Sequence, residues 1–160
     1  MRQTIYIETS IPSNYYEIRT DPQSIARKDW TQTWWHLEKD NYELFTSIGV
    51  IQELQRGNHP QKAEKLSLVS GLKLLPVTQE IVEIVEIYIS HLIMPADPSG
   101  DALHLATASY YKIDILLTWN CKHIANMKKI NHIRRINTKL GLMTPLLITP
   151  LNLIGDDNDN

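Results

Sequence analysis

The sequence contains a single cysteine, Cys121, and no long uninterrupted hydrophobic run. One cysteine cannot form an internal disulfide, so we expect the chain to fold in a reducing compartment. No apolar stretch approaches the roughly 20 residues that a membrane-spanning helix needs. The residues after Met1 are typical of a strand and not of a secretory signal peptide. These absences predict a cytoplasmic protein that makes no contact with a membrane.

Glycine is also scarce, and its placement excludes two common nucleotide-binding loops. The six glycines form neither a GxGxxG turn nor a GxxxxGK phosphate loop. Cys121 and His123 alone are too few to hold zinc. No sequence signature supplies a base or an orienting partner that would make Cys121 a nucleophile. Nucleotide binding through these loops, zinc binding and cysteine catalysis are therefore not expected.

Acidic residues are missing from residues 115–155, although the net charge of the whole chain is only -2. The cations of this region are Lys122, Lys128, Lys129, Arg134, Arg135 and Lys139. Such a local basic surface on a nearly neutral protein is compatible with phosphate contacts. A solvated face balanced by acidic helices elsewhere is an equally good interpretation of the same pattern.

Hydrophobic periodicity predicts one α/β domain. The 160 residues, 42% of them hydrophobic, suffice for a single core. Strands separated by helical segments favour parallel pairing, so we expect a three-layer α/β/α sandwich with a mainly parallel sheet. The domain should span residues 1–150, and residues 151–160 should form an acidic, flexible tail. The predicted strands cover residues 4–9, 42–47, 72–77, 115–118 and 132–137.

A long helix is predicted from Pro22 to about Asp40, and it carries an aromatic stripe. Trp30 and Trp34 are spaced to share one face of this helix, and Leu37 continues that face. Base-stacking aromatics usually lie on exposed grooves or sheets. We therefore favour a packing role for the stripe.

Oxygen-bearing side chains occur at positions where α/β proteins bind ligands. Glu8 ends the first strand, Asp101 opens a helix and Asn120 follows the fourth strand. Glu53 lies within a helix, where a solvent-facing role would be the simpler interpretation. Carboxylates that converge repel one another unless a cation lies between them. Such oxygen ligands suit Mg²⁺ or Mn²⁺, which can activate water toward a phosphate, but spacing alone does not show that these residues meet.

Four segments resemble those of PIN-domain nucleases, and in particular the ribonuclease toxins of bacterial VapBC-type toxin–antitoxin pairs. They are YIETS at 6–10, TSIGVIQEL at 46–54, GDALHLATAS at 100–109 and LLTWNCKHI at 116–124. The resemblance covers nearly the whole chain and implies a PIN-like fold. It also implies that Glu8, Glu53, Asp101 and Asn120 are the metal-binding and catalytic residues.

The resemblance implies a divalent-metal-dependent endoribonuclease whose cleavage leaves a 5′-phosphate and a 3′-hydroxyl. It further implies an RNA substrate, a homodimer and a small antitoxin protein as partner. Two positions depart from the family pattern. Glu8 replaces the usual Asp with a longer arm, and the neutral Asn120 replaces a common Asp, so a second metal should bind weakly.

Several cationic residues are candidates for substrate contacts. Lys122, His123, Lys128 and Lys129 lie in the basic region, and His104 shares a helix face with Asp101. A hydrogen-bonded structural role for His104 is an equal alternative. Two other functions remain open: a non-catalytic RNA- or protein-binding module with a degraded site, and a metal-independent ribonuclease using His104 and His123 as acid and base.

Overall fold

The structure is a computed structural model that describes residues 1–91, 100–121, 124 and 126–154. Within this part of the chain, five strands form one sheet in the order β3-β2-β1-β4-β5, and every neighbouring pair is parallel. The strands are β1 (Thr4–Ile7), β2 (Glu43–Ser47), β3 (Lys73–Leu75), β4 (Ile115–Leu117) and β5 (Leu146–Ile148). The predicted parallel sheet is confirmed.

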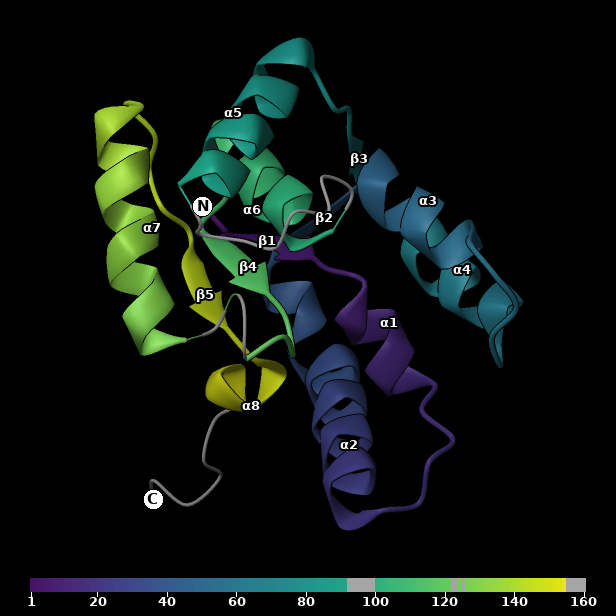
Figure 1. Cartoon of the computed structure of the whole chain (residues 1–160). Helices are drawn as coiled ribbons and strands as arrows, with labels where there is room; N and C mark the ends of the chain where they lie inside the picture. The colour runs from purple at the N-terminus through teal and green to yellow at the C-terminus, as the bar shows by residue number, and fades with distance from the viewer. Residues whose placement is uncertain (92–99, 122–123, 125, 155–160) are drawn as a thin grey trace, which may run out of the picture.

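Helices cover both sides of this sheet (Figure 1). Figure 1 shows α1 and α2 on one side and α5, α6 and α7 on the other, while α3 and α4 pack against each other near β3. The helices are α1 (Ser10–Tyr15), α2 (Pro22–Leu37), α3 (Ile48–Gln55), α4 (Lys62–Ser70), α5 (Gln79–Ser90), α6 (Asp101–Tyr110), α7 (Met127–Lys139) and α8 (Pro150–Leu153), with a 3₁₀ turn at Lys39–Asn41. The structure thus has the predicted three layers.

The two central strands are buried on both faces, which explains their continuous apolar sequences. The side chains of Ile5, Tyr6 and Ile7 in β1 are completely buried, as are Leu116 and Leu117 in β4. Each buried aliphatic side chain stabilises the fold by about 1.5–3 kcal/mol relative to exposure. The core therefore fixes the positions of the residues that follow both strands.

The prediction of a strand at residues 132–137 is wrong. These residues belong to α7, which begins after Asn126, whose side chain accepts hydrogen bonds from the backbone N–H groups of Lys128 and Lys129. Ile133 and Ile136 are buried three residues apart, while Arg134 and Arg135 between them are exposed. This spacing fits a helix. The fifth strand is instead β5, which pairs with β4.

The aromatic stripe on α2 divides between the core and the surface. Trp34 and its neighbour Trp35 are buried, whereas Leu37 is 69% exposed and Trp30 is 36% exposed. The packing role in the core is therefore confirmed for Trp34, whereas Leu37 does not pack in the core of this chain. Trp30 lies between these cases, because one part of its ring contacts the protein and another part faces solvent.

The C-terminal part of the chain includes one more short helix. Residues 151–153 of the predicted tail belong to α8, which packs against α2. Residues 155–160 of the predicted tail lie outside the described residues. In the part of the chain that the structure describes, no helix has the length and apolarity needed to cross a membrane.

The strand order places a crevice at the carboxyl end of the sheet. From β1 the chain proceeds outward through β2 to β3, and it then returns to add β4 and β5 on the other side of β1. Connections that diverge in this way leave a gap beyond the carboxyl ends of β1 and β4, where ligands bind in open α/β sheets. Glu8 follows β1 and Asn120 follows β4 at this gap.

Candidate metal centre

Glu8 lies directly after β1 and is held from β4. Ile7 in β1 pairs with Leu117 in β4. The residues that follow them, Glu8 and Thr118, therefore also lie beside each other. The Glu8 side chain is 4% exposed, and its Oε2 accepts a hydrogen bond from the Thr118 hydroxyl at 2.8 Å. A carboxylate at this depth needs such donors because burial without partners is costly.

Ser10 supplies the remaining described contacts of this carboxylate. Its backbone N–H donates to Glu8 Oε2 at 3.0 Å, and its hydroxyl makes a second, very short contact with the same oxygen. The Ser10 hydroxyl also accepts a hydrogen bond from the Trp119 N–H at 2.8 Å. Among the described residues, all hydrogen bonds to the Glu8 carboxylate go to Oε2, which leaves Oε1 available to a ligand.

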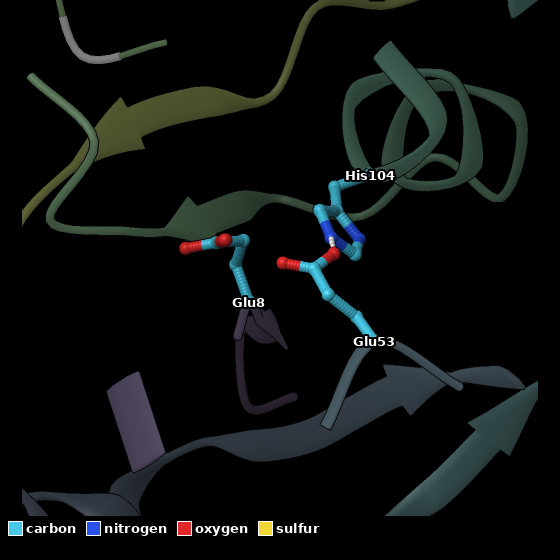
Figure 2. Close-up of side chains that lie close together, drawn as sticks. All are labelled: Glu8, Glu53 and His104. Atoms are coloured by element: carbon cyan, nitrogen blue, oxygen red, sulfur yellow. Dashed lines mark hydrogen bonds and ion pairs between the residues drawn. The ribbon is translucent and has the colours of Figure 1, made fainter. Parts of the chain in front are cut away.

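Glu53 is held by His104 (Figure 2), and further hydrogen bonds continue from this histidine into the core. Its Oε2 lies 2.9 Å from Nε2 of His104, and Nδ1 of His104 lies 2.8 Å from the Tyr6 hydroxyl. The Tyr6 hydroxyl in turn lies 2.6 Å from the Ser47 hydroxyl. Tyr6 and Glu8 are two residues apart in the strand direction, so they project to the same face of the sheet. One face of β1 thus carries both a candidate ligand and the support of another.

A glycine allows the helices that bear Glu53 and His104 to approach each other. Gly49 in α3 faces Leu103 in α6, and a Cβ added at position 49 would lie 2.8 Å from the Leu103 side chain. α3 and α6 also contact each other directly. The small residue at 49 therefore contributes to the distance that lets Glu53 reach His104.

Asp101 and Asn120 form a second pair at the same gap. The Asn120 side-chain amide donates to Asp101 Oδ2 at 2.7 Å. The Asn120 backbone N–H donates to the Thr118 hydroxyl, which also binds Glu8. Asn120 is thereby linked directly to the Asp101 carboxylate and, through Thr118, to the Glu8 carboxylate.

The electrostatics of this cluster favour bound protons when no cation is present. Burial raises the pKa of the Glu8 carboxyl, outweighing the opposing effects of His104 and of the hydrogen bonds from Ser10 and Thr118. Burial by itself would lower the pKa of His104, but its hydrogen bond to Glu53 and the nearby carboxylate charges raise that pKa overall. A divalent cation can replace these protons, since it favours the ionised carboxylates.

The predicted ligands converge on one open cleft of about 350 Å³, lined in part by Glu8, Glu53, Asp101 and Asn120. Potential ligand atoms of Glu8, Glu53 and His104 lie within 4.8 Å of one another. Asp101 lies outside that group of three but lines the same cleft. Carboxylate and amide oxygens are the donors that Mg²⁺ and Mn²⁺ accept, so the residues present fit such an ion.

The residues predicted to contact the substrate do not line this cleft in the described part of the chain. His104 is completely buried and both of its ring nitrogens have protein partners, which favours the structural role over a contact with the phosphate. Lys122 and His123 lie outside the described residues. Lys128 and Lys129 occupy the first turn of α7 and are not among the described residues that line the cleft.

Sequence reasoning missed the side chains that hold the ligands in place, namely Tyr6, Ser10, Ser47 and Thr118. Two of them carry a signal that was available. A polar Tyr6 in a strand buried on both faces needs a hydrogen-bond partner, and Thr118 directly ends an apolar run. Neither signal names the partner, because each partner is distant in sequence.

No protein-family model and no curated protein matches this sequence. Among solved structures, the chain is similar to VapC20 of Mycobacterium tuberculosis, described as a sarcin-ricin loop cleaving toxin. The fold is PIN-like. The TM-score is 0.54 at 16% sequence identity, and the match covers 74% of this chain and 92% of that chain. At this identity the likeness concerns the fold, and it agrees with the fold class predicted from the sequence.

Proposed function

We propose that this protein is a divalent-metal-dependent endoribonuclease that hydrolyses RNA phosphodiester bonds. The observation that carries the proposal is the convergence of Glu8, Glu53, Asp101 and Asn120 in one cleft at the carboxyl end of a PIN-like sheet. These residues come from separate parts of the chain. They line one cleft at the end of the sheet where open α/β sheets commonly bind ligands, which supports the proposal.

Glu8, Glu53, Asp101 and Asn120 are the residues that would hold Mg²⁺ or Mn²⁺. A bound ion of this kind supplies Lewis-acid chemistry, polarising a phosphate oxygen and making a water more acidic. Ser10 and Thr118 fix Oε2 of Glu8, and His104 fixes Oε2 of Glu53. This support leaves the carboxylates little freedom, and such preorganisation favours both ion binding and catalysis.

We further propose that the protein is the toxin of a toxin–antitoxin pair and acts in the cytoplasm. The sequence resemblance to VapBC-type toxins and the structural likeness to VapC20 support this biological role. A small antitoxin protein and a homodimeric state belong to the same proposal. Cleavage should leave a 5′-phosphate and a 3′-hydroxyl, as the resemblance implies.

Cleavage of total RNA by the purified protein tests the enzymatic proposal. We expect cleavage in Mg²⁺ or Mn²⁺, none in EDTA, and recovery after the metal is restored. Asp101→Asn keeps the side-chain shape but removes a charge, and it should lower the rate by at least about a hundredfold. Asp40→Asn is the matched control, because Asp40 is exposed and does not line the cleft.

Two other outcomes would contradict the proposal. Tight Mn²⁺ binding without cleavage of any RNA would favour a non-catalytic RNA- or protein-binding module, an alternative that the Asn at position 120 supports. Activity that survives EDTA would exclude metal dependence. It would favour histidine chemistry, although His104 is buried with both ring nitrogens hydrogen-bonded.

A further inference from the structure

Trp119 lies at the edge of the metal cleft and is firmly held. It lies between Thr118 and Asn120, and only 7% of it is exposed. Its indole N–H donates to the Thr31 hydroxyl at 2.7 Å, and its backbone N–H donates to Ser10. The ring therefore has a fixed position next to the residues that hold Glu8.

Two side chains of α2 pack on this fixed ring. The Arg27 guanidinium lies 5.5 Å from the centroid of the Trp119 ring, a cation–π distance. The Trp30 ring stacks on Trp119 with centroids 6.0 Å apart and planes inclined by 23°. We call Arg27, Trp30 and Trp119 the tryptophan–arginine cluster. Arg27 and Trp119 line the cleft, and the partly exposed Trp30 packs on Trp119 just beyond that lining.

Part of this cluster is exposed to solvent. Trp34 and Trp35 on the same helix are buried, whereas Trp30 keeps 36% of its surface exposed. An aromatic ring with an exposed surface beside a cleft offers a face on which a nucleotide base can stack. The Trp30 ring is thus both positioned by Trp119 and accessible to a ligand.

The charge of Arg27 complements a phosphate. A cleft lined with carboxylates repels a polyanion, so an RNA substrate needs cations close by. Arg19 also lines the cleft, but its guanidinium is paired with Glu17 at 2.9 Å. Within the described part of the chain, Arg27 has no carboxylate partner. Its guanidinium is therefore available to an incoming phosphate, which arginine binds through paired N–H groups.

We propose that the tryptophan–arginine cluster is a binding site for one unpaired ribonucleotide next to the scissile phosphate. Arg27 binds the phosphate of that nucleotide, the exposed face of Trp30 stacks on its base, and Trp119 holds both side chains in position. Only an unpaired base can present its face to an aromatic ring in this way. The inference rests on the proposed function, since it takes the adjacent cleft as the place of cleavage.

Binding measured without catalysis tests this site separately from cleavage. In EDTA, fluorescence anisotropy compares a labelled single-stranded 12-nucleotide RNA with the same sequence in a duplex. Trp30→Ala should weaken binding of the single strand about tenfold, as expected for loss of one stacked base, and leave duplex binding unchanged. Trp30→Phe should retain most of the affinity because a ring remains. Leu37→Ala is the matched control, since Leu37 is an exposed apolar residue of the same helix outside the cleft.

Arg27 is tested through the salt dependence of the same binding. Arg27→Met should weaken single-strand binding. It should also reduce the magnitude of the slope of log affinity against log salt concentration by about 1, the change expected for loss of one phosphate contact. Arg27→Lys should keep that slope, because the charge remains. These variants also separate a phosphate contact from a purely structural cation on Trp119, which would leave the slope unchanged.

The outcomes distinguish this proposal from the proposed function. Wild-type affinity for the single strand in both Trp30→Ala and Arg27→Met would overturn the nucleotide site and leave the cluster as a protein-contact surface, even if the protein cleaves RNA. Weakened binding in these variants, together with no cleavage in any metal, would support the site and contradict the ribonuclease proposal.

Discussion

His104 Nε2 lies 2.9 Å from Glu53 Oε2, although the two residues are 51 positions apart in sequence. The same imidazole meets the Tyr6 hydroxyl through Nδ1, so both of its nitrogens are occupied. Donation of the second ring N–H to a carboxylate or similar group is a common way to orient residues at metal sites. In the metal site that we propose, His104 is therefore a positioning residue that holds Glu53 and does not touch the substrate.

Replacing His104 should weaken the metal site. For His104→Asn we expect activity to fall about 10–100-fold, the range seen when the support of a metal ligand is removed. Mn²⁺ affinity, measured by isothermal titration calorimetry, should fall as well, and saturating Mn²⁺ should restore part of the rate. Tyr6→Phe should have a smaller effect because His104 keeps its contact with Glu53 in this variant. His91→Asn, at an exposed position, is the control, and equal Mn²⁺ affinity in His104→Asn and wild type would contradict the positioning role.

Shortening Glu8 should reduce activity even though the family that the sequence resembles usually carries Asp at this position. Thr118 and Ser10 hold Oε2 of Glu8, and Glu8→Asp withdraws that oxygen by about 1.5 Å, one carbon–carbon bond. Mg²⁺ tolerates little error in octahedral geometry. Glu8→Gln keeps the length but removes the charge, and it should also lose activity. Mn²⁺ affinity and cleavage rate measured for both variants check this, and a gain of activity in Glu8→Asp would show that the pocket is built for the shorter side chain.

The stability of the metal-free protein should fall as the pH rises. The pKa values of Glu8 and His104 are both raised in the folded protein, so folding favours their protonated forms. For each group the stabilising contribution is complete below its ordinary pKa, 4.5 for Glu8 and 6.5 for His104, and is lost as the pH rises through the raised value.

Thermal unfolding in EDTA between pH 4 and 8 measures this dependence, with the pH range set by those ordinary values. Glu8→Gln should flatten the low-pH part of the curve, because the variant side chain does not titrate. Mg²⁺ should stabilise the wild-type protein more at high pH than at low pH, since ion binding displaces protons. Stability that rises with pH in EDTA would show that these two groups do not dominate.

The basic N-terminal turn of α7 should affect RNA binding and not the chemical step. Lys128→Ala combined with Lys129→Ala should raise the apparent KM and reduce the salt dependence of binding, while kcat stays near the wild-type value. Steady-state kinetics at several salt concentrations separate these quantities. An unchanged salt slope would assign this turn to an ordinary solvated face.

Hydrophobic patterning was sufficient to predict the layers of this fold. Runs such as residues 4–7 and 115–117 are apolar enough to be central strands, and the helical segments between them require parallel pairing. The same patterning failed at residues 132–137, where a short sequence with two isoleucines fits either a strand or one face of a helix. The fifth strand, Leu146–Ile148, was recognised only through its pairing with β4.

The sequence by itself placed Glu8 after the first strand, Asn120 after the fourth and Asp101 at a helix start, because local periodicity determines where such elements end. The resemblance added Glu53, whose position on a helix is otherwise uninformative. Only the tertiary structure showed that His104 contacts both Glu53 and Tyr6. It alone also showed that the partly exposed Trp30 stacks on the buried Trp119. Periodicity shows which face of an element is buried, but which residues meet across that face depends on how distant elements pack, and no local pattern specifies that packing.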